Sequence, residues 1–163
     1  MAVDMFLKIE GPEIKGESQD KTHKGEIDVL AWSWGASQSG TTHMGSGGGG
    51  GKTNVQDLSF THYVDSASNL LLQRVFDGKH LDKVTLVVRK AGGTPLEYIT
   101  ITMEDVMVTS ISTGGSGGED LLTENVVLNF SKVNYVYKPQ DAKGGAGADK
   151  KAGWDIAENK TLV

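Results

Sequence analysis

The segment HMGSGGGGGKT, residues 43–53, has the composition of a phosphate-binding loop. Lys52 and Thr53 match the end of the G-x-x-x-x-G-K-[ST] pattern, in which backbone amides surround the phosphates and the lysine reaches them. The position that needs the first glycine of the pattern, however, is occupied by Ser46. The residues after Thr53 alternate like a strand, whereas phosphate binding depends on the N-terminus of a helix at that point. We therefore interpret the segment as a glycine-rich connector, and nucleotide hydrolysis at Lys52 and Thr53 is the weakest alternative.

A second motif, GGSGG at residues 114–118, matches the G-x-S-x-G elbow that raises a serine nucleophile between a strand and a helix. A strand pattern precedes Ser116, but the following EDLLTENVVLNF returns to strand character after one turn. The helix that the elbow requires is therefore missing. We interpret the segment as a tight turn with glycines at positive φ, and we assign no catalytic residue.

The residues that usually bind metals are also unfavourably spaced. The chain has no cysteine, and its four histidines (His23, His43, His62 and His80) form neither an i, i+4 pair nor an H-E-x-x-H motif. The stretch GGSGGED departs from the calcium-binding repeat at Glu119 and occurs once, whereas such sites are built from stacked repeats. The sequence thus predicts no metal site, no cofactor and no enzymatic activity.

The charge and hydropathy of the chain exclude further classes of protein. The 163 residues carry a formal net charge of -5 at pH 7, unlike a protein that neutralises nucleic-acid phosphates. No run approaches the roughly 18 to 20 apolar residues of a membrane span. The N-terminal MAVDMFLKIEGPE lacks the apolar core and cleavage site of a secretory signal. We expect a protein that is assembled in the cytoplasm, binds no nucleic acid and inserts into no membrane.

Most of the chain has the sequence pattern of β-strands. Alternating or continuous apolar patterns predict strands at residues 3–9, 27–39, 55–64, 83–90, 96–111 and 123–137, with a short last strand near Trp154. We expect a bulge or bend near Glu104 and Asp105, where the alternation loses its phase. In the second strand the bulky Trp32 and Trp34 share one face, and the opposite face carries only the small residues Ala31, Ser33 and Gly35.

One helix is predicted at about residues 67–77, within SASNLLLQRVFDGKH. Ser66 is the candidate N-cap, and Gly78 provides the left-handed conformation that ends a helix. About seven strands with one helix favour an all-β sandwich or barrel. We expect a single domain over residues 1–163, with an extended glycine-rich loop at 40–53 and an exposed, mobile loop at 139–152.

Two long stretches in fixed order resemble a known family. They are IKGESQDKTHKGEIDVLAWSWGASQSG near the start and STGGSGGEDLLTENVVLNFSKVNYVYKPQ near the end, and the late GWDIAENK extends the similarity nearly end to end. These stretches resemble the haemolysin co-regulated proteins (Hcp), the tube subunits of the type VI secretion system. The resemblance implies a two-sheet, partly closed β-barrel with one helix that assembles into a homohexameric ring.

The resemblance also implies function and partners. Rings of this family stack into a hollow tube, and contraction of a surrounding sheath drives the tube, a spike and bound effectors out of the cell. A chain of this kind is secreted by its own machine without a signal peptide, and its partners are its own copies and the spike, sheath and effector proteins. The alternative is a monomeric β-sandwich that binds a small ligand or a carbohydrate.

Candidate site residues follow from the same resemblance. Because the inner wall of such rings is a sheet surface, we expect the small face of the second strand to line the lumen and meet effectors: Ala31, Ser33 and Gly35. We expect the glycine-rich segment to contact a neighbouring subunit or the next ring, through Gly45, Ser46, Gly47, Gly48 and Lys52.

Overall fold

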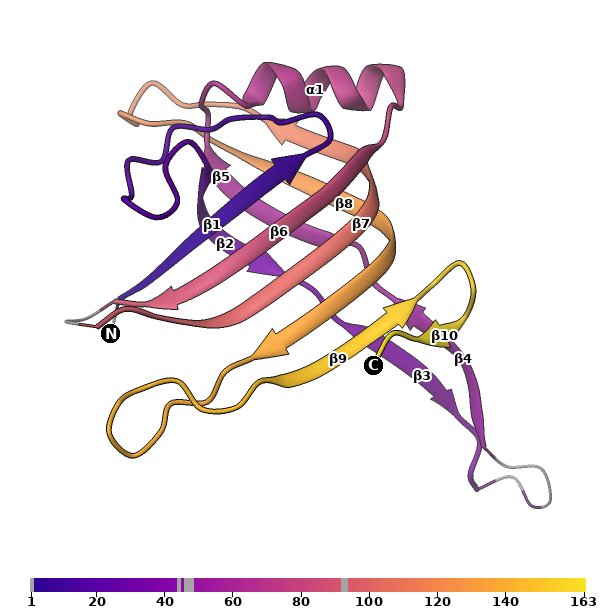
Figure 1. Ribbon diagram of the computed structural model, residues 1–163. Coiled ribbons are helices and arrows are strands. Elements are labelled where there is room, and N and C mark those ends of the chain that lie inside the picture. The colour runs from indigo at the N-terminus through magenta and orange to yellow at the C-terminus, as the bar shows by residue number, and fades with distance from the viewer. Residues whose placement is uncertain (1, 44, 46–48, 92–93) are drawn as a thin grey trace.

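The computed structural model describes residues 2–43, 45, 49–91 and 94–163 of the chain. These residues form ten strands and one helix (Figure 1). The helix is α1, Ser68–Asp77. The strands are β1 Val3–Glu10, β2 Ile27–Ser33, β3 Ala36–Gly40, β4 Gly50–Val55, β5 Leu58–Tyr63, β6 Leu81–Lys90, β7 Leu96–Thr113, β8 Thr123–Tyr137, β9 Lys150–Asp155 and β10 Lys160–Thr161.

Six strands close into a barrel in the order β8-β5-β2-β1-β6-β7, because β7 also pairs with β8. The ladder between β7 and β8 is long and runs from the pair Ile99 and Tyr137 to the pair Thr113 and Glu124. β9 and β10 extend the sheet beyond β8, and β3 and β4 form a separate two-stranded sheet. The predicted all-β barrel with a second sheet and one helix is therefore confirmed for the described residues. All six strands of the barrel are joined into one closed sheet, whereas the sequence analysis expected a partly closed barrel.

The barrel interior is filled by alternate residues of its strands. In β5, Leu58, Phe60 and His62 are buried, whereas Ser59 and Thr61 between them point outward. This is the period-two pattern of a strand with one covered face. Burial of each large apolar side chain contributes about 1.5 to 3 kcal/mol relative to exposure. The core therefore fixes which side chains of each strand reach the outer surface.

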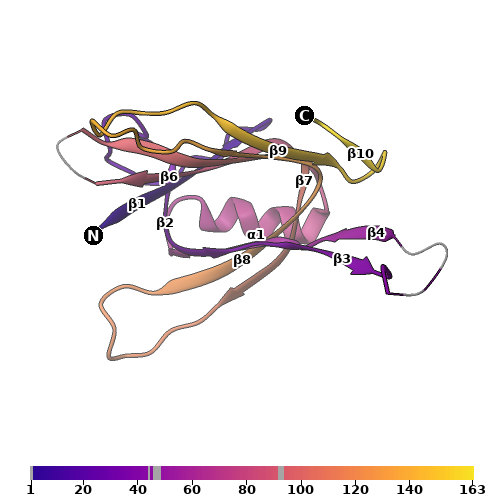
Figure 2. The same cartoon turned by 90° about the horizontal axis from the view of Figure 1, so that it is seen from below.

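Helix α1 lies across one end of the barrel and packs against β7 (Figure 1). Figure 2, seen from below, shows the helix through the barrel, across its far end. Leu71 is its buried residue, while Leu70 and Phe76 are 44% and 72% exposed. The helix ends as predicted, because Gly78 has a φ of 67° and its N–H donates to the Arg74 carbonyl.

The start of the helix differs from the prediction. α1 begins at Ser68, and Ser66 does not cap it. Instead Asp65 Oδ1 accepts a hydrogen bond from the Ala67 N–H at 2.8 Å, and the Asp65 N–H donates to Ser68 Oγ at 3.0 Å. An aspartate and a serine three residues apart thus satisfy donors at this helix end.

Two predicted strands are interrupted. The predicted strand 27–39 divides into β2 and β3 at Trp34 and Gly35. In the predicted strand 55–64, Val55 is the last residue of β4, and β5 begins only at Leu58. The Gln56 N–H donates to the Gly35 carbonyl at 2.9 Å and joins the two breaks. Beyond this point β3 and β4 form a hairpin that projects from the barrel (Figures 1 and 2).

Both predicted loops are shorter than expected. Residues 50–53 of the proposed loop 40–53 belong to β4, because Gly40 pairs with Gly50 and Gln38 with Thr53. The loop proposed for 139–152 ends earlier, because β9 begins at Lys150. Backbone pairing, which residue composition does not reveal, extends the strands into both glycine-containing segments.

The expected bulge or bend near Glu104 and Asp105 is present as a local backbone irregularity, without a shift of register. Asp105 has a φ of 54°, but the pairs of Glu104 with Lys132 and of Val106 with Phe130 keep one register across it. The register of β7 shifts elsewhere, opposite Val88 and Arg89 on β6 and between Val108 and Ser110.

Candidate functional site

A face of small, mostly polar side chains covers the outside of the barrel over β2, β5, β8 and β7. Their neighbours along the strands point the other way: Phe60 and Val126 are buried, and Trp32 packs against the core. Strand alternation therefore turns this set outward. We call it the small-residue face and define it as Ala31, Ser33, Ser59, Thr61, Ser110, Ser112 and Asn125.

Strand pairing makes this face continuous, with the half-buried Val127 of β8 between Ser59 and Ser110. Ala31 pairs with Thr61, and Ser33 pairs with Ser59. Thr61 pairs in turn with Asn125, and its hydroxyl donates to Asn125 Oδ1. Asn125 pairs on its other side with Ser112 of β7. Residues from four strands that are far apart in the sequence thus lie on one continuous surface.

The face is neutral and mostly polar. None of its seven residues is charged at neutral pH, and none is large. The acidic neighbour Glu124 is buried with its side chain inside the barrel. Hydroxyl and amide groups can exchange hydrogen bonds with water or with a polar protein surface, but no fixed charge holds a partner in place. Such a face suits transient contact better than tight binding.

Two of the three residues predicted for the lumen lie on this face. Ala31 and Ser33 are exposed on β2, but Gly35 lies beyond the end of the strand. A Cβ at Gly35 would stand 3.3 Å from Gln56 Oε1, so a larger residue here would require a small shift of the Gln56 side chain. Sequence reasoning missed the rest of the face, although the polar residues at alternate positions of β5 were visible as a pattern.

Of the residues predicted for subunit contact, the structure describes Gly45 and Lys52. Lys52 is exposed on β4, and Gly45 is exposed with a φ of 55°. Ser46, Gly47 and Gly48 fall outside the described residues. Lys52 belongs to the two-stranded sheet and the small-residue face to the barrel, so the two predicted sites stand on different sheets.

Neither sequence motif for catalysis has its required setting. Lys52 and Thr53 lie inside β4, and β5 follows β4, so no helix N-terminus faces this segment in the described chain. Ser116 is exposed in a turn between β7 and β8, again without a following helix. The described residues also hold no group of three or more histidine or carboxylate side chains that could bind a metal ion. Among the helices of the described chain, none is long and apolar enough to cross a membrane.

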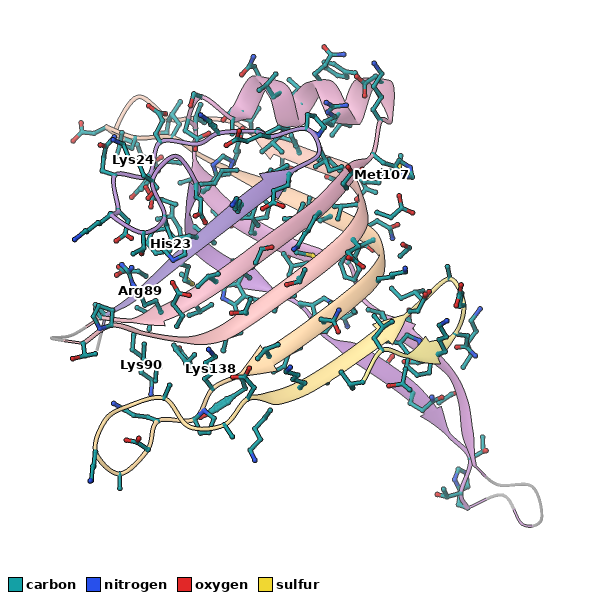
Figure 3. All side chains as sticks on the ribbon, in the orientation of Figure 1. His23, Lys24, Arg89, Lys90, Met107 and Lys138 are labelled. Atoms are coloured by element: carbon teal, nitrogen blue, oxygen red, sulfur yellow. The ribbon has the colours of Figure 1, made fainter. Side chains whose placement is uncertain are left out.

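His23 has a structural setting next to Arg89 (Figure 3). Its ring stacks on Phe6 at 4.4 Å, and its Nε2 lies 2.6 Å from Glu97 Oε1. Arg89 donates to Asp20 at 2.6 Å, and this hydrogen bond holds the pKa of the Asp20 carboxyl well below its usual range. These contacts fasten the segment between β1 and β2 onto the barrel.

Comparisons with known proteins agree on one family. A family profile described as "Type VI secretion system effector, Hcp" matches residues 6–137. The chain is 58% identical over 161 residues to "Protein hcp1" of Pseudomonas aeruginosa, covering 98% of each chain. The crystal structure of Hcp1 from Salmonella typhimurium is 40% identical, with a TM-score of 0.78 over 99% of this chain and 100% of that one. A structure of a type six secretion system protein is 31% identical, with a TM-score of 0.88 over 98% and 99% of the two chains.

Proposed function

This chain belongs to the Hcp family of the type VI secretion system, and from that membership we propose that it is a structural tube subunit without enzymatic activity. Its copies assemble into hexameric rings, the rings stack into a tube, and the tube carries effectors through its lumen. Spike, sheath and effector proteins are its other partners. The chain leaves the cytoplasm by this secretion machine.

The small-residue face is the observation that carries the assignment of the lumen wall. A wall that cargo must pass needs short side chains, so that the channel stays wide, and no fixed charge, so that cargo is released. Ala31, Ser33 and their neighbours on β5, β7 and β8 meet both conditions. We assign Ala31 and Ser33 to this wall and leave Gly35 out of it.

Exposed apolar side chains support self-assembly. Phe76 is 72% exposed, Leu121 is 61% exposed and Val64 is 46% exposed. The Val64 N–H donates to the Leu122 carbonyl, which places the segment before α1 beside the segment before β8. Large apolar side chains that one chain leaves uncovered are commonly covered by a neighbouring copy.

The hairpin of β3 and β4 supports a contact between subunits. Every residue of β3 is exposed, and a two-stranded hairpin is marginally stable in water by itself. We assign its tip, with Gly45, and the outward side of β4, with Lys52, to contact with a neighbouring subunit or ring. Ser46, Gly47 and Gly48 belong to the same assignment by their position in the sequence.

The mass of the protein in solution tests the proposal. Light scattering should give about six times the mass of one chain, as a closed homo-oligomer requires, and negative-stain images should show rings with a central hole. A strictly monomeric mass across micromolar concentrations would contradict the ring and would favour the monomeric ligand-binding alternative.

A further inference from the structure

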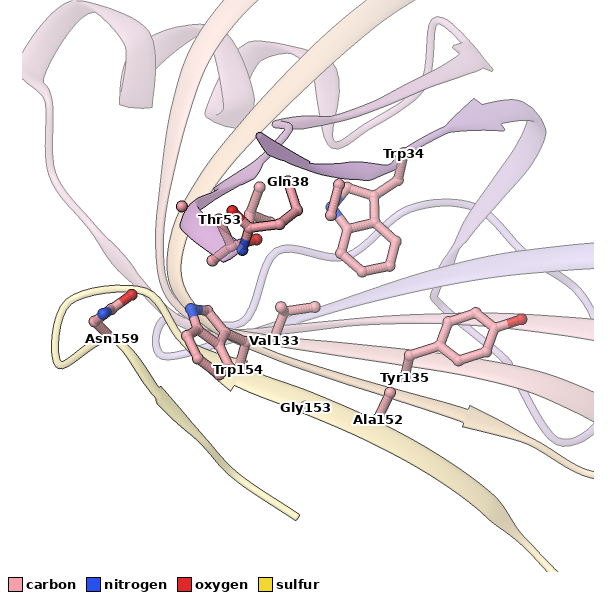
Figure 4. A pocket seen from close by; sticks show the side chains of 12 residues that line it. Trp34, Gln38, Thr53, Val133, Tyr135, Ala152, Gly153, Trp154 and Asn159 are labelled. Atoms are coloured by element: carbon pink, nitrogen blue, oxygen red, sulfur yellow. The ribbon is translucent and has the colours of Figure 1, made fainter. Parts of the chain in front are cut away.

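A cavity of about 410 Å³ lies at the base of the hairpin, between β3 and β4 on one side and β8 and β9 on the other (Figure 4). The hairpin contributes Gln38 and Thr53, and the barrel sheet contributes Tyr135 and Trp154. No residue of the small-residue face lines it. A volume of several hundred cubic ångströms is the size at which pockets accept small molecules.

The walls of the cavity are aromatic. The Trp34 and Tyr135 rings lie 6.4 Å apart between centroids, with their planes inclined by only 24°. Trp154 adds a third ring from β9, and Val133 lies between these rings in Figure 4. Nearly parallel ring faces contact a flat molecule over a large area. The shape of the walls therefore favours a planar apolar ligand.

The lining holds no charged side chain. Its polar side chains are the uncharged Gln38, Thr53, Asn159 and Tyr135, together with the two indoles. A charged ligand would lose its hydration here without gaining a counter-charge, which is unfavourable. The lining therefore favours an uncharged ligand.

Two hydrogen-bond donors of the lining have no acceptor. Trp34 Nε1 and Trp154 Nε1 are buried and make no hydrogen bond with any described residue. Figure 4 shows the nitrogen of Trp154 turned toward the hairpin residues Thr53 and Gln38. A buried donor without an acceptor is destabilising, and a ligand oxygen that reaches it removes that cost.

We propose that this cavity binds a planar, uncharged aromatic small molecule that carries a hydrogen-bond acceptor for an indole N–H. Thr53 and Val55 face the cavity from β4, whereas Lys52 and Asn54 alternate with them and point away. The subunit contact assigned to Lys52 thus leaves the cavity free. The site adds a small-molecule cargo or regulator to the tube role and lies within one chain.

Coumarin, which has a carbonyl acceptor, and naphthalene, which has none, test the site on the purified full chain. Two of the three tryptophans line the cavity, so binding should quench the intrinsic fluorescence. We expect saturable binding with one site per chain, and coumarin should bind about tenfold more tightly than naphthalene. In Trp154→Phe, which keeps a ring and removes the N–H, the advantage of coumarin should shrink to about threefold or less. Ala152→Phe should weaken binding of both probes at least tenfold by filling the cavity.

Three results would overturn the proposal. One is the absence of saturable binding by rings, and another is unchanged binding by Ala152→Phe with unchanged mass and unfolding midpoint. The third is binding by dissociated chains but not by rings, which would show that a neighbouring copy fills the cavity. Light scattering on the same samples tests the ring separately from the small-molecule site. A protein that binds coumarin but is monomeric would contradict the proposed ring and would still support the proposed site.

Discussion

His62 on β5 and Glu124 on β8 face each other as a register pair inside the barrel, with His62 Nε2 2.8 Å from Glu124 Oε1. His62 is fully buried, and Glu124 is 4% exposed. Although the two atoms are close, neither imidazole nitrogen has the geometry of a hydrogen bond with a described residue. Asp65 Oδ2 lies 3.6 Å from the other imidazole nitrogen. The structure thus buries a histidine between two carboxyl groups where a barrel core is otherwise apolar.

Removal of one member of this pair should destabilise the fold strongly. His62→Leu leaves the Glu124 carboxyl buried without its partner, so the free energy of unfolding should fall by about 3 to 5 kcal/mol. In the double variant His62→Leu/Glu124→Leu both polar groups are gone, and most of that loss should be recovered. Urea unfolding at fixed protein concentration measures both. A double variant that is less stable than the single one would show that the pair itself contributes to stability.

The ion pair of Asp20 and Arg89 should make stability depend on pH. Arg89 lowers the pKa of Asp20, mainly through its hydrogen bond to the carboxylate, so Asp20 stays ionised in the fold at a pH where the unfolded chain is already protonated. The contribution of the pair is therefore complete above the ordinary aspartate pKa of about 4 and is lost as the pH falls below it.

Asp20→Asn isolates this contribution. At pH 7 the variant should unfold at a lower urea concentration than the parent chain, and the difference should narrow between about pH 4 and pH 3. Asp77→Asn tests the same linkage at a second carboxyl, because the pKa of Asp77 is also lowered, mainly by the Lys79 backbone N–H, so its difference from the parent chain should narrow over the same pH range. A difference for Asp20→Asn that stays constant down to pH 3 would assign the effect to packing.

Helix α1 offers a direct comparison of a buried and an exposed apolar residue. Leu71 is fully buried against the barrel, so Leu71→Ala should reduce the free energy of unfolding by about 2 to 5 kcal/mol. Phe76 is 72% exposed in the single chain, so Phe76→Ser should change it by about 0.5 kcal/mol or less in a dissociated chain. If Phe76→Ser also shifts the ring toward smaller species in light scattering, a neighbouring copy covers this side chain.

Features that depend on residues close together in the sequence were predicted correctly. Gly78 ends α1 because a left-handed residue is needed there, and glycine adopts that conformation without strain. The buried face of β5 follows from alternation within a few residues. The start of α1 was predicted wrongly, because Asp65, Ser66 and Ser68 are all residue types that cap helices and the sequence does not show which of them forms the hydrogen bonds.

Features that depend on pairing between distant strands were not predicted. Closure of the barrel needs β7 to pair with β8 along its whole length, and the hairpin needs Gly40 to pair with Gly50 across a glycine-rich stretch. The sequence identified Ala31 and Ser33 as small outward residues, but Asn125 joins them only through the register of β2, β5 and β8. Alternation therefore found one strand of the candidate lumen wall, and the pairing of strands found the other three.

Labelling of single cysteines tests the proposed lumen wall. The natural chain has no cysteine, so Ser33→Cys introduces one thiol per subunit at an exposed position of β2. If Ser33 faces a channel closed by the ring, a small maleimide should label every subunit, whereas a maleimide on a 40 kDa polymer should label few subunits in each intact ring. The physical reason is crowding, because the thiols then share one enclosed volume. The same variant unfolded in urea is the control and should accept the polymer on every chain.

Gln19→Cys provides the matched position, because Gln19 is exposed on the segment between β1 and β2 and makes no side-chain hydrogen bond in the described structure. Mass spectrometry counts the labels on both variants, and light scattering must show that each remains a ring. Complete polymer labelling of intact Ser33→Cys rings would place Ser33 on an open outer surface. The small-residue face would then be an external wall, and the lumen would have to be formed by another side of the barrel.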